Sequence, residues 1–244
     1  MVSFIDFHCH IDFYENTDEI IKNARESNVN IILNNGINRE ANRKTIALSK
    51  KYSEVKACLG LYPIEALKLT DKEIDEEINF IKKQNITAIG EVGMDFAHSQ
   101  EKEKQKNIFR KFIKLSKELD KPIIVHSRKA ELECIELLEE EKAKKVVMHC
   151  FTGKKKLIER IEKNNWFLTI PTMVVYSEQT QEFVKMISIS QLLCETDSPY
   201  LHPERKDDNE PANVVEAYKK VAEIKNMTLE EVKNVIFMNW QKLI

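Results

Sequence analysis

The sequence predicts an α/β fold, namely a (β/α)8 TIM-type barrel that forms a single domain over residues 1–244. Eight short apolar segments alternate with amphipathic segments, a pattern that indicates repeated strand–helix units and a parallel sheet. The chain has 244 residues, close to the roughly 250 residues of a typical barrel of this kind. The alternative is an open doubly wound sheet, but no Gly-x-Gly-x-x-Gly motif follows the first predicted strand. No linker or low-complexity segment divides the chain.

The predicted strands are almost continuously apolar and rich in Ile and Val, as expected for strands that are buried on both faces. In chain order they are 4–9 (FIDFHC), 30–35 (NIILNN), 55–60 (VKACLG), 87–92 (TAIGEV), 122–127 (PIIVHS), 145–150 (KVVMHC), 166–170 (WFLTI) and 191–197 (QLLCETD).

The clearest predicted helices lie between these strands and after the last one. Residues 71–83 and 101–119 each carry an apolar stripe at helical spacing, formed by Ile74, Ile78 and Ile81 in the first and by Ile108, Phe112, Leu115 and Leu119 in the second. A final pair of helices is expected near 211–225 and 228–240. Thr228 and Glu231 have the spacing of a capping box at the start of the second.

Composition and charge restrict the class of protein. The formal net charge of −2 argues against a surface built for duplex DNA, although it permits a local basic patch. Asp6 interrupts the apolar N-terminal run, so we predict no signal peptide, and no segment approaches the ~18 apolar residues of a membrane span. The five cysteines are odd in number and form no Cys-x-x-Cys pair, so we expect reduced thiols and a cytoplasmic protein.

Polar residues stand at the ends of several predicted strands. His8 and His10 are two residues apart on the first strand, so their side chains point to the same side. Further ionisable residues end the fourth, fifth, sixth and eighth strands: Glu91, His126, His149 and Asp197. In a parallel barrel these strand ends meet at one face, where active sites form.

A single histidine or aspartate at a strand end is usually a structural polar residue, and Asp197 alone would be read as a turn or helix cap. Six such groups on apolar strands are different, because each buried charge needs a partner. Imidazole and carboxylate suit zinc and other first-row metals. Four histidines and two carboxylates are too many for one tetrahedral ion with an open position, so two ions that share a carboxylate fit better.

Several motifs resemble those of the TatD-type metal-dependent deoxyribonucleases, which belong to the amidohydrolase superfamily. They are His-x-His on the first strand, GEVGMDF at 90–96, VHSR at 125–128, MHCFTG at 148–153, ETDSPYL at 195–201 and NEPANV at 209–214. They occur in the family's order and span residues 6–214.

The resemblance implies two divalent ions per chain, with Zn²⁺ favoured and Mg²⁺ or Mn²⁺ as alternatives. One ion would be held by His8, His10 and Asp197 and the other by His126 and His149, and Glu91 would bridge the two. Asp197, as general base, and Glu91 would be the catalytic residues in hydrolysis of DNA, at ends or in single strands.

One motif departs from the family. The family usually has a Gly-x-His-Pro turn after the third strand, whereas this sequence has GLYP at 60–63, with Tyr62 in the place of the histidine. A phenol is a poor acid or base at neutral pH, so this change favours weak or redirected nuclease activity.

Candidate substrate contacts are Tyr62, Arg128, Lys154 and Arg205, which lie near the predicted mouth. Arg128 is suited to binding phosphate, with a salt bridge to a loop carboxylate as the alternative. Lys154 belongs to the run GKKK at 153–156, which is either a solvated helix face or a guide for phosphate, since cations oppose the dipole at a helix start. We expect Cys9 and Cys150 to pack inside and assign no metal role to His98 or His202.

Two other functions remain open at this point. One is a small-molecule amidohydrolase, such as a lactonase, a deacylase or a phosphodiesterase acting on a small ester. The other is a binding protein whose metals only stabilise the fold. A full ligand set with a candidate base argues against the latter, since structural metal sites are closed. No obligate protein partner is indicated.

Overall fold

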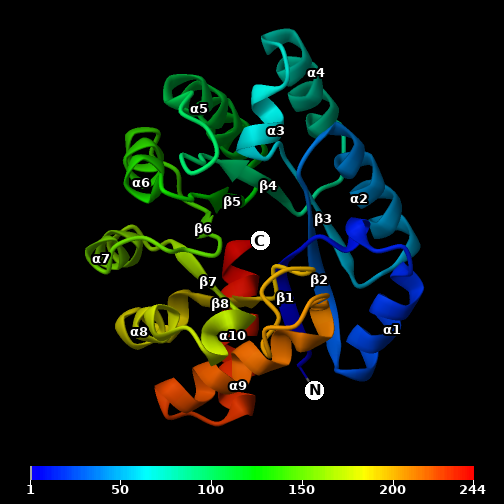
Figure 1. The fold of residues 1–244 in the computed structure, drawn as a ribbon, viewed down its shortest axis with the longest axis vertical. Helices are drawn as coiled ribbons and strands as arrows, with labels where there is room; N and C mark the ends of the chain where they lie inside the picture. Colours follow the sequence, from blue (N-terminus) through cyan, green and yellow to red (C-terminus); the bar gives the residue numbers. More distant parts are fainter. Residues whose placement is uncertain (1) are drawn as a thin grey trace.

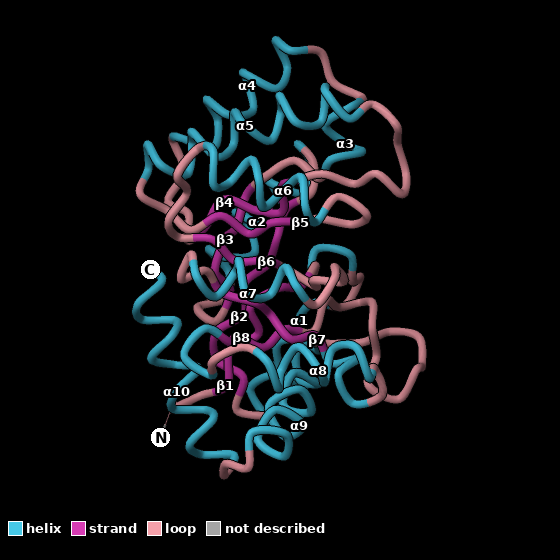
Figure 2. The backbone as a smooth tube through the Cα atoms, turned by 90° about the vertical axis from the view of Figure 1, so that its left-hand side faces the viewer, coloured by secondary structure: helices cyan, strands magenta, loops and turns pink. Residues whose placement is uncertain are grey.

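A computed structural model describes residues 2–244, and it has eight parallel strands in one sheet whose order follows the sequence. Figure 1 shows the strands ringed by helices, and Figure 2 shows them grouped in the middle of the molecule. The strands are β1 (Phe4–Cys9), β2 (Val29–Gly36), β3 (Val55–Leu59), β4 (Ala88–Gly93), β5 (Ile123–His126), β6 (Val146–Met148), β7 (Phe167–Pro171) and β8 (Leu192–Glu195). The predicted (β/α)8 barrel is confirmed.

Ten α-helices and four short 3-10 helices follow the strands in residues 2–244. The α-helices are α1 (Thr17–Glu26), α2 (Arg39–Lys51), α3 (Pro63–Leu67), α4 (Asp71–Lys82), α5 (Lys102–Leu119), α6 (Glu131–Glu140), α7 (Lys156–Lys163), α8 (Glu178–Met186), α9 (Val214–Lys225) and α10 (Leu229–Leu243). The 3-10 helices are η1 (Ile11–Phe13), η2 (Thr172–Val175), η3 (Ile189–Gln191) and η4 (Pro211–Asn213).

The apolar stripes predicted for α4 and α5 do face the core. Ile74 and Ile81 are buried on α4, and Ile108, Phe112 and Leu115 are buried on α5. The predicted capping box is present at the start of α10, where the side chains and backbones of Thr228 and Glu231 bond reciprocally. These helices therefore bury the faces that their spacing indicates.

The last predicted strand was too long. The expected strand covered 191–197, but β8 ends at Glu195, and Asp197 has a φ of 55°, in the left-handed region. After Glu195 the chain leaves its pairing with β7, and the backbone groups of Asp197 and Ser198 bond to β1 and the residue that follows it. Asp197 N donates to the carbonyl oxygen of His8 (2.9 Å), and His10 N donates to that of Ser198 (2.8 Å).

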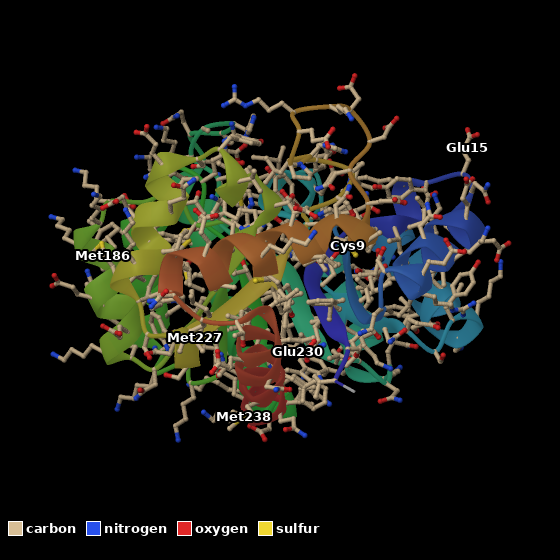
Figure 3. The ribbon with its side chains drawn as sticks, turned by 90° about the horizontal axis from the view of Figure 1, so that it is seen from below. Cys9, Glu15, Met186, Met227, Glu230 and Met238 are labelled. Carbon is tan, nitrogen blue, oxygen red and sulfur yellow. The ribbon has the colours of Figure 1, made fainter. Side chains whose placement is uncertain are left out.

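The two C-terminal helices, α9 and α10, pack against β1 where it lies beside β8. We call this junction of the first and last strands the seam. The Phe7 and Trp240 rings meet edge to face at 5.5 Å between centroids, and the Tyr218 hydroxyl donates to the carbonyl oxygen of Ile5 (3.1 Å). Figure 3 shows α9 (orange) crossing the molecule, with α10 (red) below it. The last two helices, α9 and α10, thus cover the first strand, β1.

One glycine permits a close approach between β4 and β5 at their carboxyl ends. Gly93 has a φ of 144°, and a Cβ atom on it would lie 1.9 Å from the carbonyl oxygen of His126. Only glycine fits this conformation and this contact. The two strands can therefore bring Glu91 and His126 together at the same end of the sheet.

Candidate metal centre

The carboxyl ends of the strands bring the six predicted ligands into one cluster. His8 lies in β1, His10 follows it directly, Glu91 lies in β4, His126 ends β5, His149 directly follows β6, and Asp197 is two residues beyond β8. All but His8 line a cavity of about 720 Å³, which we call the mouth pocket. His8 lies beneath it and is fully buried.

The first half of the cluster joins His8 and His10. Their Nε2 atoms are 3.2 Å apart, and each lies 3.5 Å from Oε2 of Glu91. Asp197 Oδ1 lies 3.6 Å from Nε2 of His8 and 3.8 Å from Nε2 of His10. Because Nδ1 of His10 donates to the carbonyl oxygen of Asn35 (2.8 Å), its Nε2 carries the lone pair and points it into the cluster.

The second half joins His126 and His149 to the other oxygen of Glu91. Glu91 Oε1 lies 2.8 Å from Nδ1 of His126 and 3.9 Å from Nε2 of His149. Nε2 of His149 is also 3.8 Å from Oδ1 of Asp197. The carboxylate of Glu91 thus lies between two pairs of histidines and offers one oxygen to each pair.

Two further carboxylates, which were not predicted from the sequence, contact His126 and His149 at the ring nitrogen that faces away from the cluster. Glu195 Oε2 accepts from Nδ1 of His149 (2.9 Å), and its Oε1 accepts from the backbone N of Cys150 (2.9 Å). Both of its oxygens are engaged, so Glu195 orients His149 and leaves Nε2 free for the cluster. The sequence did contain a signal for Glu195. It precedes Asp197 by two residues, and strand alternation places side chains at this spacing on the same face.

Asp95 plays the corresponding part for His126. Its Oδ2 lies 3.1 Å from Nε2 of His126, accepts from the hydroxyl of Tyr62 (2.6 Å) and lies 2.8 Å from Nδ1 of His98. Asp95 shares the GEVGMDF motif with Glu91 at an even spacing, which is the signal that was overlooked. The hydroxyl of Tyr62 is therefore directed at a carboxylate of the protein.

Burial and neighbouring charges shift the pKa values in the cluster. Burial, with help from His149, lowers the pKa of His8 to about 3, so this imidazole is neutral. Burial raises the pKa of Asp197 to about 6. Burial alone would lower the pKa of His149, but Glu195 and Asp197 raise it to about 10.

The donor set of the cluster fits divalent cations. Three groups of three side chains have ligand atoms within 4.8 Å of one another, and Glu91 belongs to two of these groups. Nδ1 of the buried His8 has no hydrogen-bond partner among residues 2–244, and its Nε2 faces the bare Nε2 of His10. A cation between these two imidazoles and the carboxylates would satisfy both nitrogen lone pairs, so the residues present fit a divalent metal.

The candidate substrate contacts divide into two pairs. Tyr62 and Arg128 line the mouth pocket, whereas Lys154 and Arg205 are outside its lining, and the Arg205 guanidinium lies over the Tyr176 ring at 4.4 Å. Cys150 lines the pocket instead of packing inside as expected, because its φ of 40° turns the chain after β6. No helix in residues 2–244 combines the length and the apolar character needed to cross a membrane.

Residues 5–244 match the family model described as TatD related DNase. The chain is 37% identical over 243 residues to an uncharacterized metal-dependent hydrolase, MJ1582, of Methanocaldococcus jannaschii, with 98% of this chain and 95% of the relative covered. It is 33% identical over 259 residues to the human deoxyribonuclease TATDN3, with 99% and 94% covered.

Among solved structures, the TatD homologue YJJV of Escherichia coli superposes with a TM-score of 0.91 at 23% identity, over 99% of this chain and 97% of that one. At this level of identity the likeness establishes the fold.

Proposed function

The chain belongs to the family of TatD-related DNases, which are metal-dependent hydrolases, and on this premise we propose that it hydrolyses phosphodiester bonds of DNA at the candidate metal centre. The observation that carries the proposal is the position of Glu91, whose two carboxylate oxygens face different pairs of histidines. A carboxylate placed in this way suits a pair of ions that act on one phosphate.

We assign two divalent ions to the centre, one to His8, His10 and Asp197 and the other to His126 and His149, with Glu91 between them. Four imidazoles favour Zn²⁺, and Mn²⁺ or Mg²⁺ are the alternatives. When bound, the ions supply acidity to a water molecule and neutralise charge on the phosphate oxygens.

The protein's own residues supply positioning and proton transfer. Asp197 accepts the proton of the attacking water, since its carboxylate lies in the pocket and within 3.8 Å of the histidines around it. Asn35 and Glu195 fix the rings of His10 and His149 from behind. Arg128, at the rim, orients the phosphate through its planar guanidinium.

We further propose that residues 1–244 act as one domain in a reducing compartment such as the cytoplasm. All eight strands belong to one sheet, and all five cysteines are free thiols.

Tyr62 supports a second candidate, the hydrolysis of a small phosphodiester or acyl ester. Its hydroxyl is bonded to Asp95, so it does not replace the histidine that the resemblance predicts at this position. The test is a comparison of substrates with zinc-, manganese- and magnesium-loaded protein: a single-stranded oligonucleotide, the matching duplex, a small phosphodiester and a panel of acyl esters.

We expect DNA to be cleaved and the Glu91→Ala variant to be inactive. Hydrolysis of acyl esters with no cleavage of any phosphodiester would overturn the proposal. The Tyr62→His variant separates the two candidates further, because a gain in DNA cleavage would identify the phenol as the limiting group.

A further inference from the structure

The rim of the mouth pocket has an aromatic side. Phe13 in η1 is 43% exposed and Tyr200, in the segment after β8, is 56% exposed, and both line the pocket. They are the two aromatic side chains in residues 2–244 that count among the exposed large hydrophobic residues. Exposed aromatic rings that gather at a pocket, instead of scattering over the surface, indicate a binding role.

The Phe13 ring and the backbone of Tyr200 each contact a residue of the candidate metal centre. The Phe13 ring lies almost parallel to that of His10, at 5.3 Å between centroids and an angle of 17°. Tyr200 N donates to the carbonyl oxygen of Asp197 (2.9 Å), and its own carbonyl oxygen accepts from the side chain of Asn209 (2.7 Å). Since β1 and β8 are neighbours at the seam, the two rings belong to the same sector of the rim.

The opposite sector is cationic. Arg128 and Lys129 follow β5, which stands about half-way round the ring of strands from β1, as Figure 1 shows. Both are exposed, both line the pocket, and neither forms an ion pair with a carboxylate within residues 2–244. The pocket thus has a flat apolar side, an unpaired positive side, and the metal centre on its floor.

We propose that Phe13 and Tyr200 are specificity-determining residues that stack against the nucleobase next to the scissile phosphate. The inference rests on the proposed function. It assigns the base of the substrate to the aromatic side of the pocket and the phosphate to the cationic side. A nucleotide combines a planar base with an anionic phosphate. The base suits the aromatic side of the pocket, and the phosphate suits the side that carries Arg128 and Lys129. Base–aromatic stacking tolerates any base sequence, since every base has a π-face. The cavity of about 720 Å³ lies within the range of roughly 300–1,000 Å³ that small-ligand sites occupy.

The test uses two substrates with the same leaving group, thymidine 5′-(4-nitrophenyl phosphate) and methyl 4-nitrophenyl phosphate. The metal-loaded wild type is compared with the Tyr200→Leu and Phe13→Leu variants, which keep an apolar side chain but remove the flat ring. Tyr200→Phe is the conservative variant that should restore stacking. Phe237→Leu on α10, outside the pocket lining, is the matched control for loss of a ring.

We expect each Leu variant to lower kcat/KM for the thymidine ester by roughly 5- to 150-fold, which corresponds to about 1–3 kcal/mol for each stacked base. Most of the change should be in KM. The ratio of the two substrates' kcat/KM values should fall by the same factor, while Tyr200→Phe and Phe237→Leu should keep the wild-type ratio. An unchanged ratio in both Leu variants would overturn the inference.

A binding measurement makes the inference independent of turnover. Calorimetric titration with thymidine 5′-monophosphate and with inorganic phosphate should give tighter binding of the nucleotide, and the difference should shrink in Tyr200→Leu and in Phe13→Leu. Absence of hydrolysis with this binding difference intact would contradict the proposed function alone. Equal affinities in the wild type would contradict the stacking role, whatever the protein hydrolyses.

Discussion

At the scale of single residues, strand alternation and the common direction of the barrel strands predicted that the six residues gather, but they did not identify the carboxylates that hold the histidines. His8 and His10 share a face because they are two residues apart, and the fold brings them within 3.2 Å of each other. The even spacing of Glu195 from Asp197 and of Asp95 from Glu91 indicated that these carboxylates share a face, but spacing alone does not show which histidine each one contacts. The side on which Cys150 lies was predicted wrongly, since a positive φ after a strand breaks the alternation.

Glu91 and Arg128 should differ in their effect on metal binding. Glu91 faces both pairs of histidines, whereas Arg128 stands at the rim. Glu91→Ala should weaken metal binding by at least the roughly 10- to 100-fold seen when a supporting residue of a metal site is lost, and Arg128→Ala should leave it close to wild type. Titration with Zn²⁺ in both variants measures this, and equal affinities would refute the bridging position of Glu91.

Asp197→Asn should reduce turnover far more than it reduces metal content. The amide oxygen can still coordinate, but it cannot accept a proton from water, and general-base catalysis contributes roughly 10²–10⁴-fold. Rate and metal occupancy must be measured on the same sample. If the variant keeps near-wild-type turnover with a filled centre, the base lies elsewhere.

At the scale of elements, the seam between β1 and β8 positions the centre. Asp6 in β1 accepts from the backbone N (2.8 Å) and the hydroxyl (2.6 Å) of Thr196, next to Asp197. The sequence predicted both strands, but their contact across the seam, which includes the bridge between Cys9 and Ser198, depends on distant segments that no local pattern encodes.

Asp6→Ala should be strongly destabilising. Both donors of Thr196 are buried and would lose their acceptor, which costs about 1–3 kcal/mol for each unsatisfied group. Urea unfolding measures the loss. Asp75→Ala is the control, because its ion pair with Lys111 (2.8 Å) is exposed and is expected to contribute less than about 1 kcal/mol. Similar losses in both variants would show that the seam does not depend on Asp6.

The ion pair between α1 and the start of β3 should make a small, pH-dependent contribution to stability. Arg25 bonds to Glu54 (2.6 Å) and lowers the pKa of that carboxyl from 4.5 to about 2. The contribution is present above pH 4.5 and is lost as the pH falls toward 2, because the unfolded chain binds the proton first. Glu54→Gln should therefore cost no more than about 1 kcal/mol at pH 7 and nothing near pH 2. A difference in unfolding free energy that grows on acidification would contradict this sign.

At the scale of the whole molecule, the metals should stabilise the barrel as well as act in it. The proposed ligands come from five different strands or the segments that follow them, so we expect ions to bind only the folded chain. The barrel itself was predictable from alternation and length. The packing of α9 and α10 over the seam was not predictable. Amphipathic spacing shows that one face of a helix is buried, but it does not show which element that face packs against.

Elemental analysis should find close to two divalent ions per chain, and about one in the double variant His126→Ala/His149→Ala. Removal of metal with a chelator should lower Tm, with recovery on adding Zn²⁺ at a concentration well above Kd. The His202→Ala variant, which removes a partly exposed histidine outside the cluster, is the control and should keep both ions. No bound metal after reconstitution would reject the centre.

The contacts at the seam also have a consequence during synthesis of the chain. Asp197 reaches the histidines of β1 only when residues near position 196 hydrogen-bond to Asp6, about 190 positions earlier. A chain still emerging from the ribosome has its N-terminal histidines but lacks the segment that completes the centre. With the proposed ligands, the centre is therefore incomplete until residues near position 196 have been synthesised and have folded against β1.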